Sequence, residues 1–235
     1  MKTEVTEIAD GIYRLSTFVP QIGLTGFTFN QFLIDAEQPL LFHYGHRAMF
    51  PLISAAVKSV IPLEKLRWTT CSHVEGDESG ALNEWLAAAP NAVPAHGQVG
   101  INIWLTDMAN RGPRTLKNDE VLDIGGKKVR WLDTPHVPHN WDAGLIYEET
   151  TGTLFSSDLF TQMGACEATT TGDIVDAAPD DQRLRHARRD LVHIGADFFM
   201  HAQNGGVGRG AHQKTGGDHR LVVIGLGIDV FDGVD

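Results

Sequence analysis

Residues 73–77, His73-Val74-Glu75-Gly76-Asp77, decide how this chain is interpreted. Three side chains that bind metal ions alternate there with two residues that do not. The segment before them, residues 66–72, has the pattern of a buried strand. The candidate ligands therefore lie in the loop that leaves the carboxyl end of a strand, where the binding sites of α/β proteins collect.

The same arrangement, a strand followed by a candidate ligand, recurs three times. Residues 128–132 run toward His136 and His139, residues 153–155 end at Asp158, and residues 198–200 end at His201. A single histidine after an apolar run is usually a structural residue. Here a candidate ligand follows each of four strands, which instead predicts one shared site. Its ligands would be His73, Glu75, Asp77, His139, Asp158 and His201. Six ligands exceed the three or four that one ion needs, so two ions with a bridging carboxylate fit better.

These motifs resemble the metallo-β-lactamase superfamily and, within it, the branch of flavodiiron and oxygen-binding di-iron proteins. Most hydrolases of the superfamily carry His-x-His-x-Asp-His at the first loop, whereas Glu75 stands here in place of the second imidazole. Residues 139–142, HNWD, resemble the His-Trp-Pro-Asp stretch of flavodiiron enzymes, and residues 154–158, LFSSD, resemble their Leu-Phe-Ser-x-Asp. The resemblance runs from about residue 5 to about residue 202. It implies an α/β fold, the metallo-β-lactamase-like αββα four-layer sandwich.

By that resemblance, one metal would be held by His73, Glu75 and His139. The other would be held by Asp77 and His201, and Asp158 would bridge the two. The histidine that the family has in the sixth position is Glu78 in this chain. This substitution leaves the second metal with a weak carboxylate ligand or with an open water position.

His136 competes with His139, since both follow the same strand. We favour His139, because its distance along the chain to Asp158 matches the family and because Trp141 and Asp142 follow it. His136 is then expected to line the pocket or to hydrogen-bond a ligand. Trp141 and Asp142 are expected close to the ligands.

The ligand chemistry favours iron. A set of nitrogen and oxygen ligands rich in carboxylate suits iron or manganese, whereas structural zinc usually recruits thiolate. Two iron ions are therefore expected, with zinc or manganese as alternatives. The function expected is to bind or reduce a small gas, dioxygen or nitric oxide, as an oxygen sensor or as a reductase. A di-zinc hydrolase stays the alternative, because zinc lowers the pKa of a bound water to about 7.

Chain length sets the expected organisation. We expect one metal-binding domain over residues 1–202 and an atypical, glycine-rich tail over residues 203–235. Flavodiiron enzymes carry a flavodoxin domain after the metal domain, and only 34 residues follow His201. We therefore expect no flavin in this chain and a separate redox partner protein as electron donor. The resemblance also implies a homodimer.

Composition excludes some partners. A formal net charge of −11 without a basic cluster argues against nucleic acid. The chain has no apolar run near the ~20 residues that a membrane helix needs, and its first residues lack a signal region, so a cytoplasmic protein is expected. Its two cysteines are too few for a disulfide scaffold and are expected to be reduced.

Periodicity predicts the remaining elements. Strands are expected over residues 11–15, 27–34 and 40–42, and a hairpin at Gly125-Gly126. Helices are expected after Phe50, around residues 81–86, and over residues 98–108 and 181–194. The two histidines of residues 43–46, HYGH, are expected on a loop surface, with lining of the pocket as the alternative.

Overall fold

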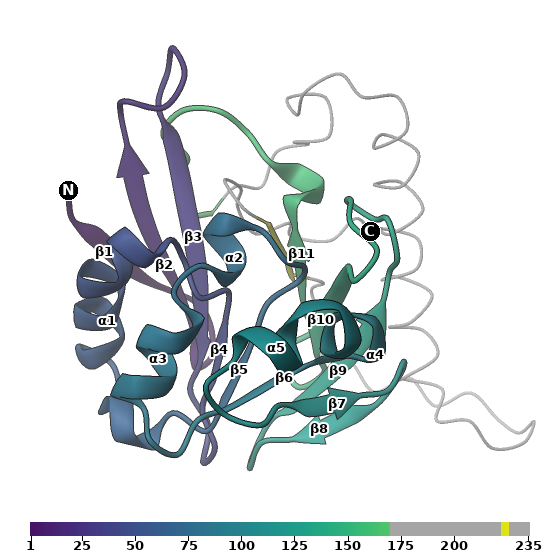
Figure 1. The fold of residues 1–235 in the computed structure, drawn as a ribbon. Helices are drawn as coiled ribbons and strands as arrows, with labels where there is room; N and C mark the ends of the chain where they lie inside the picture. Colours follow the sequence, from purple (N-terminus) through teal and green to yellow (C-terminus); the bar gives the residue numbers. More distant parts are fainter. Residues whose placement is uncertain (170–221, 226–235) are drawn as a thin grey trace, which may run out of the picture.

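The structure is a computed structural model that describes residues 1–169 and 222–225. Two β-sheets pack face to face in this part of the chain, and helices cover the outer face of the first sheet (Figure 1). The sheets begin as antiparallel hairpins, because β-branched and aromatic residues fill the strands while glycine and polar residues fill the turns.

The first sheet contains seven strands in sequence order. Its first four strands are antiparallel neighbours, whereas β4 to β7 run parallel to one another. The strands are β1 (Thr3–Ala9), β2 (Ile12–Val19), β3 (Phe27–Ile34), β4 (Leu40–Phe42), β5 (Trp68–Thr70), β6 (Val93–Gly97) and β7 (Arg114–Leu116).

The second sheet has the strand order β12-β11-β10-β9-β8. Its strands β8 to β11 form antiparallel pairs, and β12 joins β11 in parallel at the edge. The strands are β8 (Val121–Asp123), β9 (Lys128–Asp133), β10 (Gly144–Glu148), β11 (Thr153–Ser157) and β12 (Val222–Gly225).

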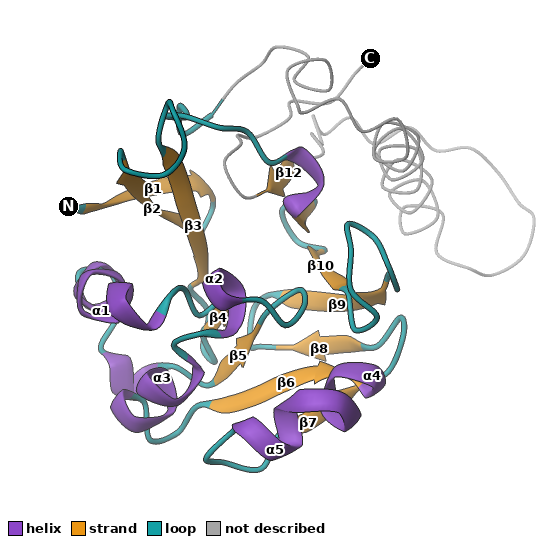
Figure 2. Ribbon diagram, turned by 45° about the horizontal axis from the view of Figure 1, so that its top comes forward, coloured by secondary structure: helices purple, strands orange, loops and turns teal. Residues whose placement is uncertain are grey.

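The helices lie between strands that run in parallel, which need crossover connections. Two of them, α1 and α3, lie side by side over the first sheet (Figure 2). The helices and single turns are η1 (Arg47–Met49), α1 (Phe50–Lys58), η2 (Leu63–Lys65), α2 (Gly76–Ser79), α3 (Leu82–Ala88), α4 (Gln98–Gly100), η3 (Ile101–Leu105), α5 (Thr106–Met108) and η4 (Asp158–Phe160).

Strand β3 is buried on both faces and separates two hydrophobic cores. Phe29 and Leu33 point toward the helices and join a core that includes Trp85 of α3. Phe32 points to the other side, where it packs edge-on against Phe155 of the second sheet at a centroid distance of 5.4 Å. Successive side chains of a strand point to opposite faces, so β3 contributes to both cores, with Thr28, Asn30 and Gln31 as buried polar residues between its apolar ones.

The fold class predicted from the sequence is confirmed. The described residues form a layer of helices and two packed sheets of the αββα sandwich. The predicted strands 27–34 and 40–42, the hairpin at Gly125-Gly126 and the helices at α1, α3 and residues 98–108 are present. Strands β1, β6, β7 and β10 were not predicted. The predicted helix 181–194 lies outside the described residues.

The apolar run in the predicted tail forms β12 and pairs with β11, so residues 222–225 belong to the second sheet.

Among the described residues, no helix has the length and apolar character required to cross a bilayer.

His96, on the unpredicted strand β6, is fully buried. Its ring lies 4.8 Å from the ring of Trp131 and 5.6 Å from that of Trp104, measured between centroids. Burial lowers the pKa of His96 to about 4, although the nearby carboxylate of Asp142 acts in the opposite direction. The folded protein therefore holds this histidine neutral at pH values where an unfolded chain protonates it.

This buried histidine predicts loss of stability in mild acid. Because the folded pKa lies below the unfolded value of about 6.5, the stabilisation is complete above pH 6.5 and is lost as the pH falls toward 4. Replacing His96 with leucine should make the free energy of unfolding less dependent on pH in this range, by up to about 1.4 kcal/mol per pH unit. Urea unfolding of both proteins with a chelator present measures this, and equal slopes would contradict it.

Candidate metal centre

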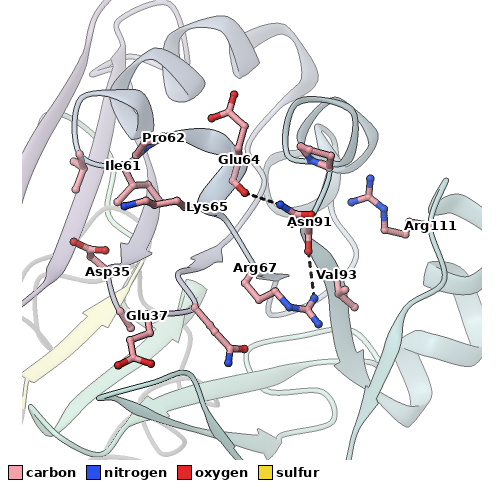
Figure 3. A pocket seen from close by; sticks show the side chains of 14 residues that line it. Asp35, Glu37, Ile61, Pro62, Glu64, Lys65, Arg67, Asn91, Val93 and Arg111 are labelled. Atoms are coloured by element: carbon pink, nitrogen blue, oxygen red, sulfur yellow. Dashed lines mark hydrogen bonds between the residues drawn. The ribbon is translucent and has the colours of Figure 1, made fainter.

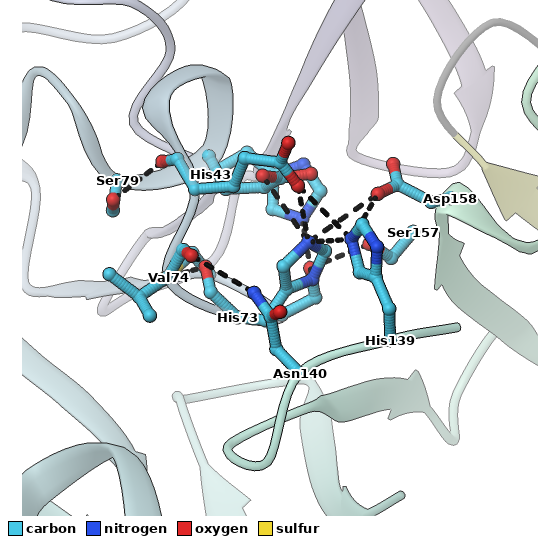
Figure 4. Close-up of polar contacts among 12 residues, drawn as sticks. His43, His73, Val74, Ser79, His139, Asn140, Ser157 and Asp158 are labelled. Atoms are coloured by element: carbon cyan, nitrogen blue, oxygen red, sulfur yellow. Dashed lines mark hydrogen bonds and ion pairs between the residues drawn. The ribbon is translucent and has the colours of Figure 1, made fainter. Parts of the chain in front are cut away.

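Four of the predicted ligands converge at one end of the two sheets. His73 follows β5, Glu75 precedes α2, His139 lies between β9 and β10, and Asp158 follows β11. The Nε2 atoms of His73 and His139 are 2.7 Å apart, and Glu75 Oε2 lies 3.2 Å from the first and 3.0 Å from the second. Asp158 Oδ2 lies 3.4 Å and 3.2 Å from the same nitrogens (Figure 4). The donor atoms of three loops thus point at one position.

A second group of possible donors adjoins the first and consists of the carboxylates of Glu75, Asp77 and Glu78. Glu75 belongs to both groups. Glu78 is fully buried, neither of its carboxylate oxygens has a hydrogen-bond partner among the described residues, and one lies 3.6 Å from His73 Nε2. A buried carboxylate without a partner is costly unless a cation or a proton compensates it.

The single turn α2 brings these carboxylates together. The backbone carbonyl of Glu75 accepts hydrogen bonds from the amide and the hydroxyl of Ser79, at 2.8 and 2.6 Å. The amide of Tyr44 donates to the carbonyl of Glu78 at 2.7 Å, which ties the turn to the segment after β4. A Cβ at Gly80 would come within 2.3 Å of the carbonyl oxygen of Gly76, so only glycine fits without a shift. The glycine after the ligands therefore keeps the turn tight.

The loop that carries His139 is locked to the loop that carries His73. The amide of Val74 donates to Asp142 Oδ2 at 2.9 Å, and the carbonyl of Val74 accepts from Asn140 Nδ2 at 3.0 Å (Figure 4). The indole of Trp104 also donates to Asp142 Oδ2, at 2.8 Å. We call this arrangement the Val74 clamp. It fixes the backbone between the first two ligands relative to the third.

A buried polar network lies behind the ligands. The hydroxyl of Ser72 is 2.8 Å from His73 Nδ1, 2.6 Å from the hydroxyl of Ser157 and 3.1 Å from His43 Nε2. His43, Ser72 and Ser157 are at most 1% exposed. The prediction that His43 lies on a loop surface is therefore wrong; burial lowers its pKa to about 3 and keeps it neutral.

Burial, hydrogen bonds and neighbouring charges shift the pKa values of several groups near the centre. Burial raises the pKa of Glu78 well above its usual range, and the charges of Asp158, Asp77 and Glu75 raise it further. Burial and the charge of Asp158 also raise the pKa of Asp77. The pKa of His139 is raised, first by its hydrogen bond with Asp158. Burial alone would raise the pKa of Asp158, but hydrogen bonds from His139 and His73 outweigh it and hold the pKa below the usual range.

The donor set fits two divalent cations. Four carboxylates, those of Glu75, Asp77, Glu78 and Asp158, carry a formal charge of −4 when ionised, which two divalent ions balance. Two imidazole Nε2 atoms converge, and the buried carboxylate of Glu78 has no hydrogen-bond partner among the described residues. A metal ion compensates such an arrangement. The thiol of Cys71 donates to the carbonyl of His73 at 3.3 Å and is absent from both donor groups.

The remaining predicted residues have different positions. Asp142 is buried and takes part in the Val74 clamp, whereas Trp141 is 69% exposed. His136 is exposed, and it does not belong to either donor group. His201 lies outside the described residues. Sequence reasoning missed Ser72, Ser157 and Asn140, whose roles depend on contacts between distant segments.

A groove of about 890 Å³ lies away from this centre, and no candidate ligand lines it (Figure 3). Its Arg67 donates to the carbonyl of Asn91 at 3.2 Å, and the side chain of Asn91 donates to the carbonyl of Glu64 at 3.0 Å. The polar groups there hold neighbouring backbone segments in place, so we assign the groove a structural role.

Comparison with known proteins agrees with this geometry. Residues 27–188 match the family model described as ODP family beta lactamase. The chain is 32% identical over 138 residues to the putative diflavin flavoprotein A 1 of Nostoc sp., which covers 57% of this chain and 24% of that protein. It is 27% identical over 188 residues to the coenzyme F420H(2) oxidase of Methanothermobacter marburgensis, with coverage of 71% and 44%. The chain thus spans less than half of these curated relatives.

Solved structures show the same fold. Rubredoxin oxygen:oxidoreductase from Desulfovibrio gigas superposes with a TM-score of 0.71 at 18% identity, over 98% of this chain and 58% of that one. The flavodiiron protein of Giardia intestinalis gives a TM-score of 0.71 at 16% identity, over 98% and 56%. Since the family model matches more than half of the chain, this protein belongs to the ODP family of beta lactamases, in the flavodiiron branch of the metallo-β-lactamase superfamily.

Proposed function

We propose that this protein holds two iron ions and uses them to bind and reduce dioxygen or nitric oxide, with electrons from a separate donor protein. The observation that supports this most directly is the carboxylate-rich donor set at the ends of β5 and β11. An iron pair supplies such a site with redox chemistry and an affinity for small gases. The protein supplies the ligands, their charge balance and the frame that fixes them.

The geometry and the resemblance together support a proposal of two ligand groups. One ion is assigned to His73, Glu75 and His139, whose donor atoms converge. The second is assigned to Asp77 and His201, with Glu78 as a buried carboxylate in the place of the family's sixth histidine. Asp158 is assigned as the bridge, and Glu75, which belongs to both groups, offers a second one.

Iron is favoured over zinc by charge and donor type. Anionic oxygen donors stabilise the more highly charged oxidation state of a redox metal, and hard oxygen ligands suit iron and manganese. Thiolate, which structural zinc usually recruits, is absent from the donor groups of the described residues. Manganese shares the preference for oxygen ligands and stays the alternative on these grounds.

The relatives support an oxidase or reductase rather than a hydrolase. One is named a coenzyme F420H(2) oxidase, and a structural neighbour is a rubredoxin oxygen:oxidoreductase. The residues that match them here lie in the metal domain, and we propose that electrons reach the site from a redox partner protein. A homodimer and a cytoplasmic location are part of the same proposal.

The first experiment is an oxygen titration of the iron-loaded, reduced protein under anaerobic conditions. Absorbance and dissolved oxygen are followed together, first without and then with an excess of chemical reductant. We expect a charge-transfer band on oxygen addition and continuous oxygen loss once reductant is present. A band that disappears when oxygen is removed, without turnover, would replace the reductase with an oxygen sensor. Retention of zinc and no response to oxygen would favour the di-zinc hydrolase.

Replacing Asp158 with alanine tests the bridge. Because a bridging carboxylate serves both ions, we expect Asp158→Ala to retain well under one equivalent of iron, whereas Asp77→Ala should keep one ion in the His73 group. Metal analysis after gel filtration gives both stoichiometries. One full equivalent on Asp158→Ala would move the bridging role to Glu75, which both donor groups contain.

A matched pair of histidine variants tests the choice of ligand in the loop before β10. His139 Nε2 lies 2.7 Å from His73 Nε2, whereas His136 belongs to neither donor group. We expect His139→Ala to weaken iron binding at least about tenfold and His136→Ala to leave it within about twofold, since losing even an outer partner of a ligand costs about 10–100-fold. Equal affinities of the two variants, measured with a competing chelator, would reject the assignment of His139.

A further inference from the structure

His43 occupies an unusual position for a residue outside the ligand set. It directly follows β4, its backbone has a φ of 67°, and its ring stacks on Phe42 at a centroid distance of 4.1 Å. The amide of His43 donates to the carbonyl of Thr70 at 2.8 Å, at the end of the neighbouring parallel strand β5. Histidine tolerates left-handed backbone better than most residues, and stacking holds its ring in one orientation.

The ring reaches the ligands through a single hydroxyl. Ser72 Oγ contacts His43 Nε2, His73 Nδ1 and Ser157 Oγ, at 3.1, 2.8 and 2.6 Å. A serine hydroxyl has one proton to donate and two lone pairs to accept with. Its three partners therefore use all of its hydrogen-bonding capacity.

Metal binding would require one tautomer of His73. For His73 Nε2 to offer a lone pair to a cation, Nδ1 must carry the proton and donate it to Ser72. Ser72 then has one lone pair and one proton left for His43 and Ser157. Without the His43 ring, one of these positions would be unmet in a fully buried site, and Ser72 would be free to turn away from His73.

The same hydroxyl reaches the other side of the centre. Ser157, the residue before Asp158, has a φ of 51° and a ψ of −133°, a conformation that is costly for a residue with a side chain. Such a backbone persists only when its surroundings hold it in place. The bond between the Ser157 and Ser72 hydroxyls is a contact that does so, and it links His43 to the loop that presents Asp158 (Figure 4).

We propose that His43 is a positioning residue for the metal pair. Through Ser72 it fixes the tautomer and ring plane of His73, and through Ser157 it holds the backbone that presents Asp158. His43 itself touches no metal in this proposal. The inference rests on the proposed metal site. It extends that site to His43, which is two hydrogen bonds away from the ligand His73.

Two variants at position 43 separate the effect of the hydrogen bond to Ser72 from the effects of side-chain volume and backbone conformation. His43→Leu and His43→Gln have similar volumes and share the same left-handed backbone cost, but only glutamine carries a donor that can reach Ser72. We expect His43→Leu to weaken cobalt(II) binding by about 10–100-fold and to alter the visible cobalt spectrum, since loss of an outer partner of a metal ligand has effects of this size. His43→Gln should stay within about threefold of the original protein.

Ser72→Ala and the double variant His43→Leu/Ser72→Ala test the route. If His43 acts through Ser72, the double variant should bind cobalt(II) no more weakly than Ser72→Ala alone. Additive losses, or equal affinities of His43→Leu and the original protein, would overturn the proposal. Thermal unfolding of each metal-free variant reports on folding, and if His43→Leu does not fold, Ser72→Ala must itself lower the affinity by about 10–100-fold or the proposal fails.

The same titration distinguishes this inference from the proposed function. If the original protein takes up neither cobalt(II) nor iron(II), the metal site itself is wrong. If it takes up two equivalents and the variants at positions 43 and 72 bind as tightly, the metal site stands and His43 has no positioning role.

Discussion

The arrangement of this protein depends on holding four carboxylates close together at one end of the sheets. Within each donor group the ligand atoms lie within 4.8 Å of one another. Two like charges at such a distance repel by about 3 kcal/mol at an effective dielectric constant of ~20. The strand ends, α2 and the Val74 clamp hold these groups against that repulsion. The pKa values of Asp77 and Glu78 are raised, first by burial and then by the neighbouring carboxylates. Two divalent cations remove the repulsion, so the fold and its proposed metals stabilise each other.

Much of the fold and of the site could be predicted from local patterns. Strand β3 and the helix α1 have clear periodicity. The expectation that ligands follow the ends of strands led to His73, His139 and Asp158, whose donor atoms lie within 3.4 Å of one another in the structure. Parallel strands place their carboxyl ends at one edge, so residues far apart in sequence become neighbours there. A rule of this kind needs only strand boundaries.

The contacts that tie the loops together could not be predicted in the same way. The bond from Val74 to Asp142 and the bond from Ser72 to Ser157 join segments 68 and 85 residues apart, and nothing in the local sequence specifies such pairs. Strand β6 was missed because Pro94, His96 and Gly97 interrupt its apolar pattern. His43 comes after β4 much as His73 comes after β5. Gly45 indicated a turn on the surface, but His43 is fully buried in the structure.

The Val74 clamp has a consequence for electron transfer. Its two hydrogen bonds, 2.9 and 3.0 Å long, attach both polar groups of one peptide residue to the loop of His139, so the two imidazoles near the centre are carried by a single frame. When a metal ion gains or loses an electron, its bond lengths change and the surrounding ligands must adjust. Ligands on one stiff frame adjust through small, shared displacements, which keeps the reorganisation energy low. Under the proposed function, electrons from a separate donor would then reach the site without a rearrangement of the loops.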